Sequence, residues 1–390
     1  MKLYLNDLGL LCAAGNTKAE VLSRLLAGDR SGLIETNAFG HKTTAGQCRA
    51  ELPDIDQRFI MYNCRNNQLL LAALSQINTT VREMIMRYGI DRIGVVLGTS
   101  TSGVSSTEQA LAYQSVNGVL PDQFHYKQQQ MGAGADFLAA YLGVTGPAYT
   151  LSTACSASGK AFASARRLIA LDLCDAVIVG GADSLCRLTI NGFAALESLS
   201  SGYCKPFGRN RNGINIGEGA SLFVLSKEPG PVQLLGIGAS SDAYHFSAPD
   251  PDGTAVIVAM KKALKDANKN PSDVDYINLH GTATVLNDTM ESKAVNAVFG
   301  NQTAVSSSKG MTGHTLGAAA ALELGFCWLL LADTSDGQLI PNINDDEPDA
   351  SLASLQLVEQ GQHLGRCLSV CQSNSFAFGG NNISIVIAKT

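Results

Sequence analysis

The feature that most constrains the fold of this chain is a structural plan that occurs twice along its 390 residues. Around residue 150, the strand-like run Ala148–Thr153 leads through the turn Cys-Ser-Ala-Ser-Gly into a long helix of small residues. Around residue 305, the run Ala304–Ser307 leads through the turn Gly310–Gly313 into a second such helix. Each half alone would leave one face of a sheet uncovered. We therefore predict an α/β fold in which two similar halves, residues 1–235 and 236–390, pack as one body.

Short runs rich in β-branched residues alternate with amphipathic or small-residue segments, which indicates buried sheets covered by helices. Strands are predicted at Ile93–Leu97, Ala148–Thr153, Ala176–Val179, Ser221–Leu225, Tyr276–Leu279, Ala304–Ser307, Leu368–Gln372 and Ile383–Ile387. Helices are predicted at Thr17–Leu26, Asn67–Tyr88, Thr107–Gln114, Ala133–Leu142, Ser156–Leu171, Thr254–Asn268, Asp288–Phe299 and His314–Ala332. The last helix is the most apolar stretch, but Glu323 and several Gly and Ala residues interrupt it. We expect a buried core helix there and no membrane span.

The composition argues against several classes of function. Lys and Arg number 28 against 34 Asp and Glu, a net charge of −6, and no cluster of cations suits the phosphates of a nucleic acid. The apolar stretch Leu8–Gly15 follows Asp7, and Lys2 is the only basic residue before it, which makes a poor secretion signal. We therefore expect a cytoplasmic protein with neither a nucleic acid nor a membrane as partner.

Cysteine and glycine spacing exclude two further kinds of site. The ten cysteines show no CxxC pair and no His/Cys metal spacing, so we predict reduced thiols and no metal. The segment Gly98–Gly103 has the glycine spacing of a P-loop, but Val104 stands where the phosphate-binding lysine must be. No GxGxxG motif opens a helix after a strand. Tight turns and close helix packing explain these glycines better than nucleotide binding.

Cys155 ends a predicted strand and precedes a helix of small residues. A thiol at a helix N-terminus faces unpaired N–H groups and the positive end of the helix dipole, which favours the thiolate. The same N–H groups can hold the oxyanion that forms when sulfur attacks a carbonyl. A buried structural cysteine is the simpler interpretation of this residue taken alone.

Two histidines strengthen the catalytic interpretation. His280 follows a strand inside the turn HGTAT, and His314 begins a predicted helix after Gly313. The chain has six histidines, and these two lie at glycine-flanked junctions where a ring could project into a cleft. A cysteine with two such histidines is the minimum set for thioester chemistry. No GxSxG elbow is present, which argues against a serine esterase.

Four motifs, in the same order, resemble those of the β-ketoacyl-acyl carrier protein synthases. They are TACSASG with Cys155, HGTATVLND with His280, SSKGMTGHTLGAAAALE with Lys309, His314 and Glu323, and NSFAFGGNN at 374–382. The resemblance extends from about residue 90 to the end of the chain. It implies the thiolase fold, a five-layered αβαβα arrangement with internal duplication, which agrees with the two halves predicted above.

The resemblance also implies a mechanism. Cys155 would accept an acyl chain from the phosphopantetheine arm of an acyl carrier protein, and the backbone amides of Cys155 and Phe376 would form the oxyanion hole. Phe376 would also be the gate between the malonyl and acyl sides. His280 and His314 would support decarboxylation of malonyl-carrier protein by hydrogen bonding the enolate oxygen. The enolate would then attack the acyl group and give a 3-ketoacyl product two carbons longer.

Two further residues would orient and polarise the region of His314: Lys309 and Glu323. The resemblance implies no metal and no intrinsic cofactor, because loss of carbon dioxide drives the reaction. The partner would be an acyl carrier protein. Its acidic surface would dock on a basic rim, and three residues lie in segments that resemble the docking region of the family: Arg58, Arg65 and Lys127. Ordinary solvated surface charge is the alternative interpretation of these three residues.

Several positions depart from the family pattern. Gly208 and Asn212 replace acidic residues of the motif KPFDxxRDGF, and FGGTN reads FGGNN at 378–382. Thr107 aligns with a position that lines the acyl pocket in the family and is often larger and apolar. These changes leave the nucleophile and both histidines intact but favour a specialised pathway, such as aryl polyene synthesis, over housekeeping fatty-acid synthesis.

The family also implies a dimer. Its central strand, here Ala148–Thr153, would pair across a two-fold axis, either in a homodimer or in a heterodimer with a homologous chain-length factor. Two other functions stay open at this point. One is a non-catalytic chain-length or scaffold subunit, which would lack the nucleophile. The other is a thiolase-type acyltransferase, which would pair the nucleophile with a second cysteine and one histidine.

Overall fold

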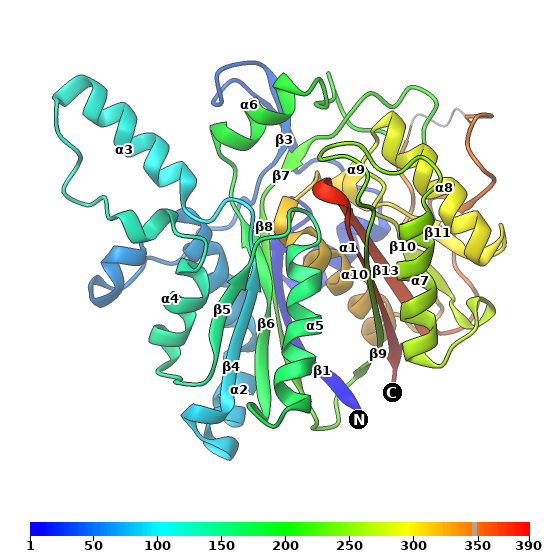
Figure 1. The fold of residues 1–390 in the computed structure, drawn as a ribbon, viewed down its shortest axis with the longest axis horizontal. Coiled ribbons are helices and arrows are strands. Elements are labelled where there is room, and N and C mark those ends of the chain that lie inside the picture. The colour runs from blue at the N-terminus through cyan, green and yellow to red at the C-terminus, as the bar shows by residue number, and fades with distance from the viewer. Residues whose placement is uncertain (345–348) are drawn as a thin grey trace.

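The computed structural model describes residues 1–344 and 349–390 (Figure 1). Eleven strands are hydrogen-bonded in the order β12-β11-β10-β13-β14-β9-β1-β8-β6-β4-β5. The strands of the first half are β1 (Leu3–Cys12), β4 (Ile93–Gly98), β5 (Ala148–Leu151), β6 (Ala176–Asp183) and β8 (Gly219–Ser226). Those of the second half are β9 (Val232–Ser241), β10 (Tyr276–Asn278), β11 (Ala304–Ser306), β13 (Val370–Ala377) and β14 (Asn381–Lys389), with β12 (Gln356–Leu357) outside β11.

The two halves repeat the same topology. From the outside of the sheet to its centre, the order is β5-β4-β6-β8-β1 in the first half and β11-β10-β13-β14-β9 in the second. If the five strands of each half are numbered along the chain, both orders read 3-2-4-5-1. The pairs β4–β5 and β4–β6 are parallel, as are their counterparts β10–β11 and β10–β13, and the other pairs among these five strands of each half are antiparallel. The additional strand β12 pairs with β11 in parallel. The halves join where three residues of β1 pair with three of β9. The predicted internal duplication is therefore confirmed.

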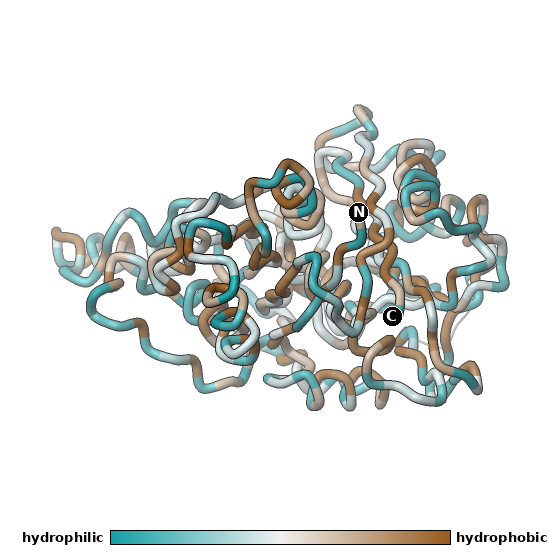
Figure 2. Tube along the Cα trace, turned by 90° about the horizontal axis from the view of Figure 1, so that it is seen from below, coloured by the Kyte–Doolittle hydropathy of each residue, from teal (hydrophilic) through white to brown (hydrophobic). Residues whose placement is uncertain are grey.

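Helices complete five layers. The long helices α5 (Ala157–Ala170) and α10 (Ala319–Asp333) lie in the middle, where α10 packs on β6 and β8 of one half and on β13 and β14 of the other. Outer helices cover the first half, α2 (Arg65–Tyr88) and α4 (Ala133–Leu142), and the second half, α7 (Thr254–Ala267) and α8 (Val285–Phe299). The hydropathy trace shows hydrophobic and hydrophilic stretches alternating along the chain (Figure 2).

The remaining elements lie around these layers. They are the helices α1 (Lys18–Leu26), α3 (Val104–Asn117), α6 (Arg187–Ala195) and α9 (Lys309–Thr312), and a small sheet of β2 (Leu33–Thr36), β3 (Thr43–Gly46) and β7 (Ile216–Gly217). Six 3₁₀ turns complete the described secondary structure: Gln57–Tyr62, Ile90–Arg92, Tyr126–Gln129, Pro271–Asp273, Leu316–Ala318 and Phe378–Gly380.

The apolar segment near residue 320 is the core helix that the sequence predicts. Residues Leu316–Asp333 have a mean hydropathy of 1.6 and are apolar enough to cross a membrane, but 89 % of this segment is buried inside the protein. Its predicted start is wrong, because His314 precedes the helix. Leu316 has a φ of 51°, which breaks the helical path, and α10 begins at Ala319.

Two of the longest strands, β1 and β9, were not predicted. In β1 the polar pair Asn6 and Asp7 interrupts the apolar pattern. The pairing register with β8 shifts between Leu5 and Asp7, and the Asp7 carboxylate accepts hydrogen bonds from Lys18 and Thr80. The bulge accommodates a charge inside a strand. The predicted division at 235/236 falls inside β9, and we propose that the halves divide in the loop before this strand.

The P-loop-like glycines serve close packing. A Cβ on Gly98 would lie 2.1 Å from the backbone nitrogen of Ser158, at the start of α5, and one on Gly103 would lie 2.1 Å from the carbonyl oxygen of Gln128. Gly98 therefore lets α5 approach the end of β4, which fixes the position of the helix that follows Cys155.

We expect Gly98→Ala to destabilise the protein by about 1–3 kcal/mol, because the added methyl group must displace the backbone of α5. Urea unfolding followed by circular dichroism measures the change. Gly132→Ala is the matched control, since a Cβ there would meet no atom within 4 Å. Equal stability of the two variants would contradict this account of Gly98.

Candidate active site

Cys155 lies at the junction between β5 and α5, as predicted. Ala154 has a φ of 51°, a conformation that L-residues rarely adopt, and this sharp turn places the Cys155 side chain at the N-terminal end of α5. The side chain is buried among both halves of the molecule. The local backbone is therefore strained where the thiol is presented.

His280 and His314 come from loops of the second half. The backbone N–H groups of His280 and Gly281 both donate to the carboxylate of Glu291 on α8, each at 2.7 Å. The N–H of His314 donates to the carbonyl oxygen of Asn215 at 2.7 Å. These backbone bonds fix both histidines before either ring meets a substrate.

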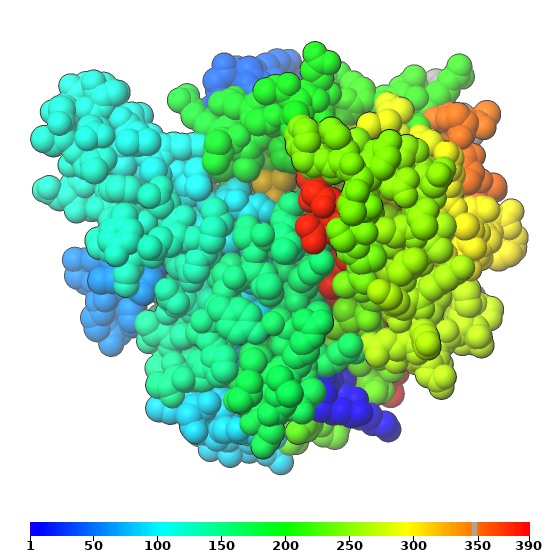
Figure 3. Space-filling view, viewed as in Figure 1, coloured from blue at the N-terminus to red at the C-terminus, as the bar shows by residue number. Residues whose placement is uncertain are grey.

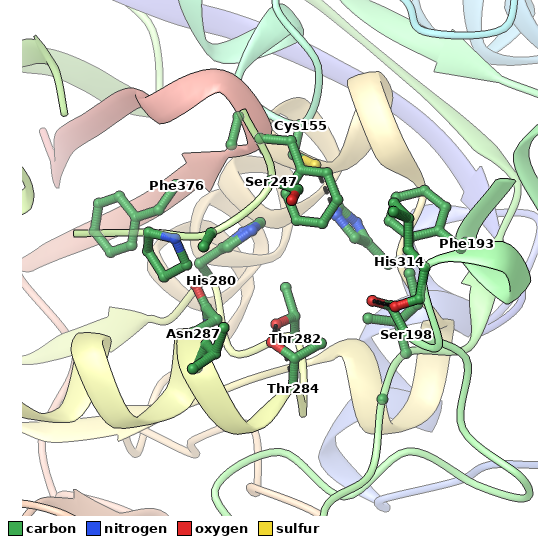
Figure 4. A pocket seen from close by; sticks show the side chains of 18 of the residues that line it. Cys155, Phe193, Ser198, Ser247, His280, Thr282, Thr284, Asn287, His314 and Phe376 are labelled. Atoms are coloured by element: carbon green, nitrogen blue, oxygen red, sulfur yellow. Dashed lines mark hydrogen bonds between the residues drawn. The ribbon is translucent and has the colours of Figure 1, made fainter. Parts of the chain in front are cut away.

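The three side chains converge at one point (Figure 4). The sulfur of Cys155 lies 2.9 Å from Nε2 of His314, and the two imidazole rings have centroids 5.3 Å apart with a nearly perpendicular arrangement. One ligand-type atom of each residue lies within 4.8 Å of the others. Residues that are 159 positions apart in the sequence thus form one buried cluster.

A backbone bond sets the tautomer of His314. The N–H of Leu316 donates to Nδ1 of His314 at 3.3 Å, so in the neutral ring the hydrogen is on Nε2. Nε2 therefore donates toward the sulfur and toward an oxygen that binds beside it. A metal would need a lone pair at this same nitrogen. The geometry of the cluster suits hydrogen-bond donation to a negative oxygen better than metal ligation.

Burial governs protonation in this cluster. Desolvation, followed by the charge of Lys309, lowers the pKa of both His280 and His314 well below the usual range, so both rings are neutral. Desolvation raises the pKa of Cys155 to about 12, against the opposite effects of Lys309 and two backbone N–H groups. Burial thus opposes the expected stabilisation of the thiolate, because the loss of water raises the pKa more than Lys309 and the N–H groups lower it.

Lys309 and Glu323 form a buried ion pair beneath the histidines. Burial raises the pKa of Glu323 to about 7, and the ammonium of Lys309 opposes that rise. The pair brings a positive charge close to both rings while its partner carboxylate limits the cost of burying it. The orienting and polarising roles of Lys309 and Glu323 stay predictions.

We propose that Phe378, and not Phe376, completes the oxyanion hole. The backbone N–H groups whose hydrogen bonding lowers the pKa of Cys155 are those of Phe378 and of Cys155 itself. Phe376 lies two residues earlier, inside β13 opposite Asn382, and its ring centroid is 6.1 Å from that of His280. Within the motif FAFGG the sequence does not tell the two phenylalanines apart, and the end of β13 decides between them.

A cavity of about 340 Å³ opens onto the cluster. Polar and apolar side chains share its wall (Figure 4). Its lining includes Cys155, Phe193, Leu196, Ser198, Asn212, Asp242, Ser247, His280, Thr282, Thr284, Val285, Leu286, Asn287, His314, Phe376 and Phe378. Asn212, one of the departures noted in the sequence, lies in this wall. Thr107 does not: it lies on α3, where its hydroxyl donates to Gln129 at 3.0 Å, and its role in an acyl pocket stays a prediction.

Two buried carboxylates at the site were missed from the sequence. Glu291 holds the turn of His280, as described above. Asp183, at the end of β6, accepts from the N–H groups of Ser100, Thr101 and Ala318. It ties the loop after β4 to the turn that follows His314. A lone acidic residue at the end of an apolar segment is the signal that could have found Asp183, whereas Glu291 lies in a mixed segment with Asp288 and Lys293 and carries no such signal.

The three predicted docking cations differ in their surroundings. Arg58 is exposed and pairs with its neighbour Asp56. Lys127 lies over the ring of Tyr62, 5.4 Å from its centroid. Arg65 instead forms two hydrogen bonds with the fully buried carboxylate of Glu218, at 2.6 and 2.9 Å. A structural role explains Arg65, whereas the docking role of Arg58 and Lys127 stays a prediction.

Comparison with known proteins identifies the family. Residues 9–229 match the description "Beta-ketoacyl synthase, N-terminal domain", and residues 232–345 match "Beta-ketoacyl synthase, C-terminal domain". The chain belongs to the β-ketoacyl synthase family. This confirms the resemblance found in the sequence and the thiolase fold, and the chain is a condensing enzyme of the acyltransferase class.

The chain is similar to relatives over its whole length. It is 31 % identical over 398 residues to Nodulation protein E of Rhizobium leguminosarum bv. trifolii, covering 98 % of this chain and 97 % of that protein. It is 29 % identical over 415 residues to 3-oxoacyl-(acyl-carrier-protein) synthase 2 of Coxiella burnetii (strain RSA 493 / Nine Mile phase I), covering 100 % and 98 %.

Solved structures agree with this assignment. The ketosynthase ApeO, in complex with its chain length factor ApeC from Xenorhabdus doucetiae, is 45 % identical with a TM-score of 0.95, covering 100 % of this chain and 98 % of that chain. The ishigamide ketosynthase/chain length factor is 26 % identical with a TM-score of 0.89, covering 100 % and 99 %.

The buried carboxyl of Glu291 gives a pH prediction. Burial raises its pKa from 4.5 to about 8, so between these values the native protein binds a proton that the unfolded chain releases. The free energy of unfolding therefore falls as the pH rises from 5 to 8, by at most about 1.4 kcal/mol per pH unit for this one group. Urea unfolding at several pH values should show a shallower decline for Glu291→Gln.

Glu83→Gln removes a solvent-exposed carboxyl of α2 and is the control for this measurement. It should keep the pH slope of the unmodified protein. An identical slope in Glu291→Gln would show that the carboxyl of Glu291 is ionised in the native state at neutral pH.

Proposed function

We propose that the protein catalyses decarboxylative condensation of malonyl-acyl carrier protein with an acyl group held on Cys155, extending the chain by two carbons. The observation that carries this proposal is the cluster of one cysteine and two neutral histidines at the end of a cavity, with Nε2 of His314 donating toward the cysteine sulfur. Substrates would arrive on the phosphopantetheine arm of the carrier protein, and no intrinsic cofactor is needed.

In the first step, the Cys155 sulfur attacks the thioester carbonyl of acyl-carrier protein. The carbonyl oxygen gains negative charge and binds to the N–H groups of Cys155 and Phe378. The bond to the carrier sulfur then breaks. Because the Cys155 thiol carries its proton at neutral pH, that proton leaves with the departing carrier thiol, so no external base is consumed.

In the second step, malonyl-carrier protein loses carbon dioxide. The electron pair of the broken C–C bond forms an enolate, and the enolate oxygen accepts hydrogen bonds from His280 and His314. The enolate carbon attacks the acyl carbonyl, and the bond to the Cys155 sulfur breaks. The sulfur takes up one proton from solvent, which restores the thiol and leaves 3-ketoacyl-carrier protein.

Cys155 argues against a non-catalytic chain-length subunit, because such a subunit lacks the nucleophile. A thiolase-type acyltransferase would bring a second cysteine to the site. Cys155 is the one cysteine among the residues that line the cavity in the described part of the chain. Two neutral donors beside a buried Lys309 favour decarboxylation over that alternative.

We further propose a specialised pathway, such as aryl polyene synthesis, in the cytoplasm, with a homologous chain-length factor as partner. Gly208 and Asn212 depart from the housekeeping motif, and ApeO, at 45 % identity, was solved in complex with its chain length factor. β5 ends the large sheet and its side chains are half-exposed, which fits pairing with a second chain along this strand.

Intact-mass measurement tests the proposed chemistry. Purified protein with its co-expressed partner should gain an acyl adduct from acyl-carrier protein and lose it on addition of malonyl-carrier protein, with release of a 3-ketoacyl product. Cys155→Ala should show no adduct. His280→Ala should acylate within a few-fold of the normal rate but condense about 100-fold more slowly, because it loses a donor to the enolate.

If His280→Ala slowed acylation and condensation to the same degree, the result would contradict the proposal that the oxyanion hole serves acyl transfer and the histidines serve decarboxylation. Condensation with acetyl-CoA in place of malonyl-carrier protein would support the thiolase alternative.

Carrier docking is tested at Arg58 and Lys127. Removing either charge should raise the KM for carrier protein by about fivefold, the effect of about 1 kcal/mol at a surface ion pair, with little change in kcat. The increase should shrink at high salt, which is measured by steady-state kinetics. Lys261→Ala, an exposed lysine on α7, is the control, and an equal rise in its KM would rule out a specific docking role.

A further inference from the structure

Helix α6, which forms part of the cavity wall, is held by few contacts of its own. Of its nine residues, Ile190 is the buried one. Cys186 stands at the N-cap position but makes no side-chain capping hydrogen bond among the described residues. The first N–H groups of a helix need partners from outside it. For α6 a side chain from another helix supplies them.

Glu108 of α3 supplies those partners. Its carboxylate accepts from the N–H of Arg187 at 2.9 Å and from the N–H of Leu188 at 2.7 Å. These are the first two residues of α6. A negative charge at a helix N-terminus also interacts favourably with the helix dipole. The bonds join α6 to α3, a helix that projects from the body of the molecule and buries only Ala110 among its described residues (Figure 3).

The other end of α6 lines the cavity and packs against the loop that follows β13. Phe193 of α6 has its ring centroid 5.5 Å from that of Phe378, and both rings line the cavity. Phe378 and Cys155 line the same cavity, and hydrogen bonding by the backbone N–H of Phe378 lowers the pKa of Cys155. Displacement of α6 would therefore remove the packing that holds Phe378 against the nucleophile.

We propose that Glu108 is a positioning residue: by capping α6 it holds Phe193 against Phe378 and so keeps the Phe378 N–H in place for acyl transfer to Cys155. This inference rests on the proposed function, and Glu108 itself touches no substrate. It acts on the oxyanion hole and leaves the histidine donors of the decarboxylation step unaffected.

The test compares Glu108→Ala with Glu108→Gln in the protein together with its partner subunit. Glu108→Ala should slow acyl transfer to Cys155 about tenfold, while decarboxylation of malonyl-carrier protein without an acyl primer changes less than twofold. Glu108→Gln, which keeps one acceptor oxygen, should fall between. General destabilisation would slow both steps together, so a parallel loss would overturn the proposal.

Hydrogen exchange gives a readout that is independent of the chemistry. In Glu108→Ala, amides of residues 187–190 and of 376–380 should both exchange faster, whereas Glu83→Ala on α2 should leave them unchanged. Faster exchange confined to 187–190, or unchanged exchange in both segments, would overturn the proposal. Absence of any acylation in the unmodified protein would instead contradict the proposed function. The exchange measurement needs no acylation, so the two failures can be told apart.

Discussion

The packing of α5 against α10 is the contact on which the site depends. Cys155 belongs to the first half of the chain, whereas both histidines and Lys309 belong to the second, so their spacing is set by how the two buried helices meet. The hydroxyl of Ser158 accepts the N–H of Ala321 at 3.0 Å, which joins the first turn of each helix. Larger side chains would push the helices apart: a Cβ on Gly159 would lie 3.1 Å from that of Ala320. Small residues in both helices are thus a requirement of the chemistry as well as of the core.

Strained turns present the reacting side chains at this contact. Ala154, Ala283 and Leu316 each have a positive φ, between 51° and 64°, and each lies within three residues of Cys155, His280 or His314. Such conformations cost roughly 1–2 kcal/mol per residue, and the surrounding hydrogen bonds must offset them. Glu291 and Asp183 supply such bonds from neighbouring elements. Their buried carboxyl groups hold backbone turns.

The sequence predicted the parts of the site that local patterns specify. Strand-to-helix junctions with glycine or small residues located Cys155, His280 and His314, and the doubled plan predicted the repeated sheet. Contacts between segments that are distant in the sequence could not be predicted from local patterns. The partner of Arg65 is Glu218, 153 positions away, so a surface role and a buried ion pair could not be told apart. Phe376 and Phe378 share one motif, and only the point where β13 ends decides which N–H faces the sulfur. β1 was missed because a bulge tolerates Asp7 inside an otherwise apolar strand.

Neutral histidines are what a buried enolate site needs. A protonated imidazole would bind an enolate oxygen more strongly, but it would also bind the malonyl carboxylate and resist its loss as carbon dioxide. Burial and the charge of Lys309 keep both rings neutral, and the backbone N–H of Leu316 directs the remaining hydrogen of His314 toward the sulfur. The ring can then donate to an oxygen without giving up its proton. Glu323 accompanies Lys309 into the interior, so the site gains a nearby positive charge without burying a lone ion. Burial and the charge of Lys309 thus keep both histidine donors neutral.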